Sequence, residues 1–388
     1  MHILTVVPKR RKPPQERKPL TGRNAGQTPG SRLGGRPWPT AVDLFCGCGG
    51  VTTALKARRF RVVAAVDHDP IACESYRSNH RNVHLYEKDI AAVDPFEIRR
   101  LLGDSGLDLL VVCSPCQPFS QQNRNSTDDD RTRLILSAVD FAKVLVPSLI
   151  FFENVPGLTR KRFEPILAEL RVGLTQIGYV VGEPQELDAA DYGVPQRRLR
   201  CVMLARRGTA PPPLPGPTTP AGHRISVREA IGDLPRLASG QADSDDALHF
   251  ARVHQAIALE RLRHIPKNGG SRTALPEQLR LECHRGHRGH PDVYGRMRWE
   301  EVAPTLTTGC TDLTRGRFAH PRDDRAITLR EAARLQTFPD NYVFSGSAKA
   351  IAAQVGNSVP VRLIEELAPA LREALAGDGG ASREAEGA

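Results

Sequence analysis

The sequence has 388 residues and a formal net charge of +10, with 54 Lys and Arg against 44 Asp and Glu. This length exceeds that of a typical compact domain and predicts one large domain with a smaller one. The mean hydropathy of −0.36 and the lack of an apolar run of about 18 residues exclude a membrane span. A short apolar stretch at 3–7 precedes the basic run at 9–12, which argues against a secretory signal. We therefore expect a soluble intracellular protein with reduced cysteines.

The positive charge is unevenly distributed along the chain. Residues 1–39 carry +8, residues 40–205 carry −1, residues 206–326 carry +5 and residues 327–388 carry −2. A localised basic surface is typical of proteins that bind nucleic acid. Residues 1–38 show no apolar periodicity, so we expect a disordered basic tail that is either passive or a nonspecific DNA-binding arm.

From residue 40 onward, short apolar runs alternate with amphipathic segments. We expect strands within AVDLF, RVVAAV, LDLLVVC and SLIFF, and helices within VTTALKARR, PIACESYRSN, RLILSAVDFAKVL and residues 163–171. Two later strands, near 179–182 and 200–204, precede a proline-rich linker at 209–220. The alternation predicts an α/β fold with a doubly wound, mostly parallel sheet covered by helices on both faces.

The composition changes after the linker. Residues 222–326 contain eight of the twelve histidines and show weak periodicity, which predicts a small, loop-rich second domain. Helical periodicity returns in TLREAARLQTFP and near 361–375. The main domain is therefore expected to comprise residues 39–221 and 327–388.

A glycine-rich segment, DLFCGCGG, follows the first expected strand at residues 43–50. Gly47, Gly49 and Gly50 lie between strand and helix, where glycine lets the backbone turn sharply and approach a ligand. Taken alone, this pattern is as consistent with a tight connection as with a binding loop.

Acidic residues follow the next two expected strands. An acid after the second strand suits a ribose diol, so Asp67 is a candidate adenosine ligand, and His68 could stack on the base. Asp89 follows the third strand and could accept a hydrogen bond from an adenine amino group. The alternative is that these aspartates cap helices.

The fourth expected strand leads into SPCQPFS, residues 114–120, and places Cys116 at the same edge of the sheet. Most cysteines are small buried hydrophobic residues. A thiol at a strand end, followed by a polar segment, is instead expected to be accessible where ligands gather. The polar segment 117–131 is long enough to close as a lid.

Two further motifs place charged residues at the same edge of the sheet. Glu153 ends the apolar run in FFENV, where it could donate to a ring nitrogen, or simply be held by a neighbouring arginine. In QRRLR, Arg198 and Arg200 should point the same way and could serve one anionic or carbonyl-rich pocket. The alternative is a solvated charge cluster.

In this order, the motifs resemble those of the DNA (cytosine-5)-methyltransferases over residues 42–363. DLFCGCGG resembles the family's cofactor loop, SPCQPFS its nucleophile motif, ENV its glutamate motif and QRRLR its arginine motif. TLREAARLQTFP and QVGNSVP, residues 354–360, resemble its two closing motifs. The chain departs from the pattern at Cys113-Ser114, where many members have Gly or Pro.

The resemblance implies a Rossmann-like methyltransferase that moves a methyl group from S-adenosylmethionine to C5 of a cytosine flipped out of duplex DNA. It implies that the Cys116 thiolate adds to C6, that Glu153 holds N3 and the amino group, that Arg200 contacts O2 and that Arg198 supports the pocket. It also implies a cofactor site made of Asp43, Phe45, Gly47, Gly49, Gly50, Asp67, His68, Asp89 and Asn357.

The same resemblance makes residues 222–326 a target-recognition domain. The residues expected to contact double-stranded DNA are Gln117, Ser120, Arg285, Arg288, Arg296 and Arg298. A group of possible metal ligands lacks a second paired motif, so we expect no metal site there; its members are Cys283, His284, His287 and His290.

We expect a monomeric, cytoplasmic prokaryotic enzyme that associates with the nucleoid when bound to DNA. It would have no obligate protein partner and would be the modification enzyme of a restriction-modification system. An RNA cytosine methyltransferase is an alternative, although the inserted domain favours DNA. A DNA-binding protein with an inactive site is another, and the intact Cys116, Glu153 and Arg200 argue against it. A nicotinamide dehydrogenase would not explain SPCQPFS.

Overall fold

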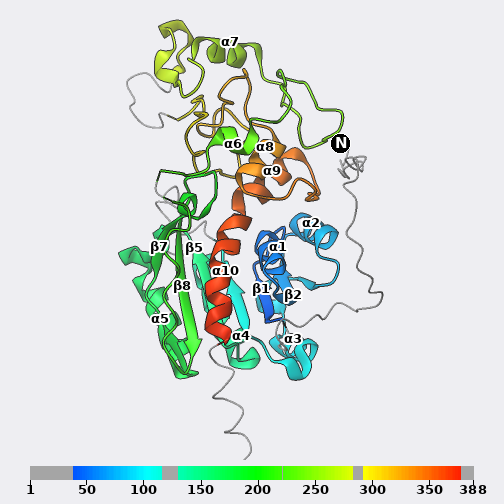
Figure 1. Ribbon diagram of the computed structural model, residues 1–388, viewed down its shortest axis with the longest axis vertical. Coiled ribbons are helices and arrows are strands. Elements are labelled where there is room, and N and C mark those ends of the chain that lie inside the picture. Colours follow the sequence, from blue (N-terminus) through cyan, green and yellow to red (C-terminus); the bar gives the residue numbers. More distant parts are fainter. Residues whose placement is uncertain (1–37, 116–129, 221, 283–291, 377–388) are drawn as a thin grey trace, which may run out of the picture.

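The computed structural model describes residues 38–115, 130–220, 222–282 and 292–376 (Figure 1). Several predictions concern residues outside these ranges: the basic tail up to residue 37, Cys116, Gln117, Ser120, Arg285, Arg288 and the group at 283–290. Within the described ranges, no helix is both long and apolar enough to cross a membrane.

The described strands form one eight-stranded sheet in the order β3-β2-β1-β4-β5-β8-β6, with β7 beside β8. The parallel strands are β1 (Thr40–Leu44), β2 (Arg61–Asp67), β3 (His84–Glu87), β4 (Leu109–Val112) and β5 (Leu149–Asn154). The long strand β8 (Leu199–Arg207) runs antiparallel to β5, β6 (Tyr179–Val181) and β7 (Gln185–Asp188). The predicted mostly parallel α/β sheet is confirmed, and β7 is an additional strand.

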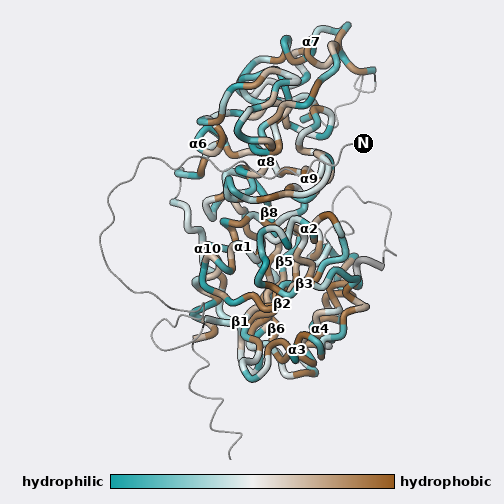
Figure 2. The backbone as a smooth tube through the Cα atoms, turned by 90° about the vertical axis from the view of Figure 1, so that its right-hand side faces the viewer, coloured by the Kyte–Doolittle hydropathy of each residue, from teal (hydrophilic) through white to brown (hydrophobic). Residues whose placement is uncertain are grey.

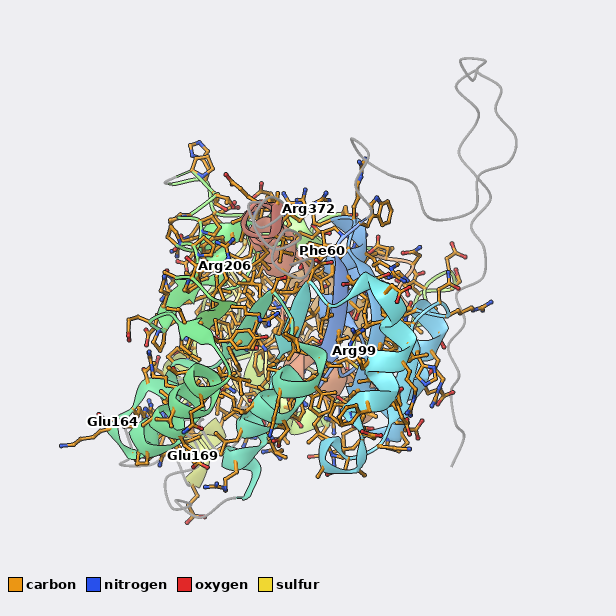
Figure 3. All side chains as sticks on the ribbon, turned by 90° about the horizontal axis from the view of Figure 1, so that it is seen from below. Phe60, Arg99, Glu164, Glu169, Arg206 and Arg372 are labelled. Atoms are coloured by element: carbon orange, nitrogen blue, oxygen red, sulfur yellow. The ribbon has the colours of Figure 1, made fainter. Side chains whose placement is uncertain are left out.

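Helices cover both faces of the sheet. On one face, α1 (Gly50–Ala57) and α10 (Val361–Ala376) pack into one hydrophobic core. On the other face, α3 (Pro95–Leu102), α4 (Ser137–Leu145) and α5 (Glu164–Gln176) pack into a second core. Seen from below, Arg372 of α10 and Glu169 of α5 lie on opposite sides of the strands (Figure 3).

The side chains of β1 explain this two-sided packing. All five of its residues are buried; Ala41 belongs to the core under α10, whereas Val42 and Leu44 belong to the core under α4. A strand that is covered on both faces has a continuous apolar sequence instead of an alternating one. This is the pattern that predicted the central strands.

Local sequence also determines where helices begin. The carboxylate of Asp69 accepts hydrogen bonds from the first turn of α2 (Pro70–Asn79), and Pro70 occupies a position where proline is tolerated. Thr328 and Glu331 form a capping box at the start of α8 (Leu329–Leu335). Ser347 caps α9 (Ala348–Asn357), a helix the sequence pattern did not predict.

Residues 222–282 and 292–326 form an upper lobe that lies above the sheet and is largely irregular (Figure 1). Its helices include α6 (Val227–Ile231) and α7 (Ala256–His264). Around α7 it has a small hydrophobic core of its own. In Figure 2, hydrophobic colour gathers in the lower half, around β1, β2, β6, α3 and α4.

The main core continues into the upper lobe. Val227, Trp299 and Phe318 belong to the same buried cluster as residues of α8 and α10. Packing therefore does not mark a boundary at residue 326, and the division of the chain into domains at 221 and 326 stays a prediction.

Candidate functional site

A cavity of 470 Å³ opens at the carboxyl ends of β1, β2, β4 and β5. Its volume is within the range of about 300–1,000 Å³ that is usual for small-molecule sites. Ligands of open α/β sheets bind at this edge. Nine of the predicted site residues line the cavity: Phe45, Gly47, Gly50, Asp67, His68, Asp89, Glu153, Arg200 and Asn357. The fold therefore brings together residues from six separate stretches of the sequence.

The glycine-rich turn after β1 is built from left-handed backbone. Phe45, Gly47 and Gly49 have φ angles of 61°, 53° and 99°. A Cβ on Gly49 would lie 2.5 Å from Nε2 of His80, whereas a Cβ on Gly47 would meet nothing within 4 Å. Gly49 is not among the residues that line the cavity. The predicted cofactor contact of Gly49 stays a prediction, and in this structure the lack of a side chain at Gly49 permits close packing against His80.

Asp67 holds the turn in place. One oxygen of its carboxylate accepts a hydrogen bond from the backbone N–H of Gly47 at 2.8 Å, and the other from that of Asp69 at 2.9 Å. The carboxylate of Asp89 accepts from the backbone N–H of Ala91 and caps a short 3-10 helix (Ile90–Ala92). The capping alternative is thus confirmed for Asp89, although both aspartates also face the cavity.

Asp43 lies behind the turn instead of in the cavity wall. Its side chain is fully buried, and Oδ2 accepts a hydrogen bond of 2.7 Å from Oγ1 of Thr52, which also contacts the hydroxyl of Tyr76. Burial raises the pKa of Asp43 to about 7. The prediction that Asp43 binds the cofactor is wrong, since no part of its side chain is exposed to the cavity.

Glu153 and Arg200 form an ion pair in the cavity wall. They come from the antiparallel strands β5 and β8, and Nε of Arg200 lies 2.6 Å from Oε1 of Glu153. The two side chains are only 7% and 8% exposed. The arginine that was expected as the alternative partner of Glu153 is therefore Arg200 itself.

The chain enters the cavity wall just before Cys116. The side-chain amide of Asn154, at the end of β5, donates to the backbone oxygen of Ser114 at 3.1 Å and thereby ties the end of β4 to β5. Pro115 lines the cavity. The neighbouring thiol of Cys113 also lines it, but burial and the nearby Glu153 raise the pKa of Cys113 well above its ordinary value. Cys113 is therefore a poor nucleophile.

Arg198 is close to the cavity but does not line it. Its side chain is 2% exposed and donates to the backbone oxygens of Leu306, Gly356 and Ser358. The role expected for Arg198 is support of the pocket. It stays a prediction, and the bonds from its guanidinium to backbone oxygens are in keeping with it. Gln196 and Gln336, which join the same network, were not predicted.

Of the four arginines predicted to contact DNA, the two that lie in the described residues, Arg296 and Arg298, differ sharply in burial. Arg296 is fully buried and donates to backbone oxygens of four residues and to the carboxylate of Asp324. Its predicted DNA contact is wrong for this structure. Arg298 is 55% exposed, pairs with Glu301 at 2.7 Å and lines a surface groove together with Arg197, Arg224 and Arg317.

A second groove of 590 Å³ lies on another face of α9. Ala348, Lys349 and Ala352 line this groove, whereas Ala350 and Ala353 line the first cavity. Helix α9 thus separates the two spaces. Throughout the described ranges, no group of three or more potential metal ligands occurs.

Comparisons with known proteins agree with this arrangement. Residues 40–373 match the family model for C-5 cytosine-specific DNA methylases. The Type II methylase M.HgiDII of Herpetosiphon aurantiacus is 38% identical over 343 residues, covering 87% of this chain and 96% of the relative. The Type II methyltransferase M1.HphI of Haemophilus parahaemolyticus is 31% identical and covers 86% of each chain.

A solved structure shows the same fold. It is described as a candidate DNA modification methyltransferase encoded within an E. coli prophage; it has a TM-score of 0.67 and 22% identity, and it covers 87% of this chain and 99% of its own. This chain belongs to the C-5 cytosine-specific DNA methylase family and is a DNA (cytosine-5)-methyltransferase.

Proposed function

We propose that this enzyme transfers a methyl group from S-adenosylmethionine to C5 of a cytosine flipped out of duplex DNA. The observation that carries the proposal is the buried pair of Glu153 and Arg200, which lies in one cavity wall with Pro115, the residue before Cys116. A carboxyl group and a guanidinium are the groups needed to hold the N3 and O2 edge of a cytosine ring.

The residues that line the cavity support S-adenosylmethionine as its ligand. Asp67 presents a carboxylate to a ribose diol, Phe45 presents an aromatic ring for the adenine, and His68, Asp89 and Asn357 add polar contacts in the same wall. When bound, S-adenosylmethionine would supply the electrophilic methyl group. Gly47 has open space where a side chain would begin, so the backbone can lie directly against the ligand.

The protein's own residues would activate the target base. The Cys116 thiolate would form a bond to C6 while N3 takes up a proton from solvent by way of Glu153, which makes C5 an enamine carbon. Arg200 would stabilise the developing charge at O2. After methyl transfer, the C5 proton would pass to solvent and the bond between sulfur and C6 would break. Loss of the proton from N3 would then give neutral 5-methylcytosine and restore the Cys116 thiolate.

Duplex DNA is the proposed substrate. A target base in a duplex would have to leave the helix to reach this cavity. The exposed Arg298, with Arg197, Arg224 and Arg317 beside it, supports phosphate or base contact by the upper lobe. Both relatives compared above carry Type II names. We therefore propose a modification role in a prokaryotic restriction-modification system, with the enzyme acting in the cytoplasm as a monomer.

Bisulfite sequencing of DNA from cells that express the chain tests the reaction and maps the target. We expect methylation at C5 within one short sequence. A duplex with 5-fluorocytosine at that site should then form a covalent adduct, since fluorine cannot leave as the C5 proton does. An adduct should form with Cys113→Ser but not with Cys116→Ser.

The outcomes separate the possible errors. Unmethylated DNA, with methylation of tRNA by the purified enzyme, would reject DNA as the substrate. Methylated DNA without a trapped adduct would reject the covalent mechanism. An adduct in Cys116→Ser that disappears in Cys113→Ser would reassign the nucleophile.

A further inference from the structure

Arg198 connects two parts of the molecule that are distant in sequence. Its guanidinium donates to the backbone oxygen of Leu306 at 3.0 Å on the upper lobe, and to those of Gly356 and Ser358 at 2.8 and 2.9 Å at the end of α9. These last two residues flank Asn357, which lines the cavity. One buried side chain therefore holds a cavity wall against the upper lobe.

Two buried glutamines extend this connection. Oε1 of Gln196 accepts from the backbone N–H of Leu306 at 2.8 Å, and its amide donates to Oε1 of Gln336 at 3.0 Å. The amide of Gln336 donates to the backbone oxygens of Val355 and Ser358. Both glutamines are completely buried. Such a network stabilises one arrangement of the backbone, because a shift would leave buried polar groups without partners.

The backbones themselves are in direct contact at this point. A Cβ on Gly356 would lie 2.4 Å from the carbonyl of Thr307 and 2.6 Å from the nitrogen of Thr308. Segment 303–308 is also joined to the residues just before β8. The backbone N–H of Arg197 donates to the backbone oxygen of Ala303, and the backbone N–H of Ala303 donates to that of Pro195. A movement of segment 303–308 must therefore move either Arg198 or the end of α9.

We propose that Arg198 is a positioning residue that couples occupancy of the cofactor cavity to the conformation of segment 303–308 of the upper lobe. Cofactor binding against Asn357 stabilises the arrangement in which the upper lobe binds DNA, and DNA binding raises cofactor affinity by the same factor, because such coupling is reciprocal. This inference rests on the proposed binding of S-adenosylmethionine and duplex DNA.

The coupling is measured by titration calorimetry with S-adenosylhomocysteine, which permits no turnover. Its Kd is determined without DNA and with a saturating duplex that carries the mapped target. We expect the ratio of the two Kd values in the wild type to lie within the usual range for coupled sites, about 5 to 150. Arg198→Met should bring the ratio close to 1, and Arg198→Lys should retain part of it, because an ammonium can still donate to two carbonyls.

Arg206→Met is the matched control. Arg206 lies on β8, the strand that begins immediately after Arg198, and it also donates to a backbone oxygen, that of Ala374, but it does not line the cavity. Its variant should keep the wild-type ratio. A wild-type ratio of 1, or an unchanged ratio in Arg198→Met, would overturn the proposal. If the wild type bound no S-adenosylhomocysteine at all, the proposed function would be rejected instead.

Hydrogen exchange on the wild-type enzyme tests the coupling without any variant. Segment 303–308 does not line the cofactor cavity, so a ligand in the cavity does not cover it. Added S-adenosylhomocysteine should nevertheless slow amide exchange in peptides that cover 303–308, as well as in those that cover 354–360. Slower exchange in 354–360 alone would contradict the role of Arg198.

Discussion

Nε of Arg200 lies 2.6 Å from Oε1 of Glu153, and the two side chains are buried together in the wall of the cavity. The pair is possible because β8 runs antiparallel to β5, which places the start of β8 beside the end of β5. Two motifs that are almost fifty residues apart thus meet at the edge where the parallel strands end. Each side chain supplies the counter-charge that permits burial of the other.

Removal of Arg200 is expected to affect stability as well as activity. Arg200→Met leaves the buried carboxylate of Glu153 without its partner, and should lower the free energy of unfolding by about 3–5 kcal/mol. The double variant Glu153→Gln/Arg200→Met should recover most of that loss but remain inactive. Urea unfolding and a methyl-transfer assay would measure the two effects.

An exposed ion pair provides the control for this experiment. Nη2 of Arg133 lies at a similar distance, 2.7 Å, from Oε1 of Glu169, but these side chains are 58% and 51% exposed. Arg133→Met should change the free energy of unfolding by less than about 1 kcal/mol. If Arg200→Met were as stable as the wild type, burial would not make the loss of the partner of Glu153 costly, contrary to this prediction.

Two glycines of the turn after β1 should respond differently to alanine. Gly49→Ala places a Cβ against His80 in addition to the strain of a positive φ, so it should clearly lower the melting temperature. Gly47→Ala carries only the backbone strain of about 1–2 kcal/mol. Its methyl group would enter the cavity, however, and should weaken binding of S-adenosylhomocysteine. Similar melting temperatures for both variants would contradict this distinction.

Asp43 should give the stability of the protein an unusual pH dependence. The native carboxyl has a pKa raised to about 7 by burial, whereas the carboxyl of the unfolded chain titrates near pH 4. Between these values the native state binds more protons than the unfolded state, so this group lowers stability as the pH rises from about 4 to 7. The loss is at most about 4 kcal/mol.

The comparison with Asp43→Asn isolates that contribution, since other titrating groups are common to both proteins. Its amide oxygen can still accept from Thr52. The free energy of unfolding of the wild type, minus that of the variant, should fall between pH 4 and 7 and level off above pH 7. A difference that rises or stays flat over this interval would show that the native carboxyl is ionised.

Substitutions of Arg296 and Arg298 should have different effects, the first on stability and the second on DNA binding. Arg296→Lys removes donors from several buried carbonyls and should destabilise the upper lobe by roughly 2–3 kcal/mol. Arg298→Ala should leave the melting temperature unchanged and weaken DNA binding, with a shallower dependence on salt concentration. Weaker DNA binding by a fully stable Arg296→Lys would restore Arg296 as a DNA contact.

Arg296 and Arg298 also show that the burial of a side chain cannot always be predicted from the local sequence. Arg296 and Arg298 are two positions apart and chemically identical, yet one is fully buried and the other is 55% exposed. The difference comes from carbonyl groups of segments far along the chain, including Leu262 and His320. Nothing in the local sequence encodes those partners.

The central strands were predictable for the opposite reason. β1, β4 and β5 are completely buried and β2 is largely buried, so their sequences are mostly apolar and stand out from their surroundings. In β7 only Leu187 is buried, and its sequence QELD gives no signal. The site residues at strand ends were predicted for the same reason as the strands, whereas the role of Arg198 depends on carbonyls more than a hundred residues away.

A single helix, α9, separates the first cavity from the groove that contains Lys349. Because four of its residues are alanines, each space can be narrowed from its own side. Ala353→Met would protrude toward the first cavity, and Ala348→Met, at an exposed position, would protrude toward the groove that contains Lys349. The two variants would therefore obstruct either the cavity or the groove, each without a change to the backbone of α9.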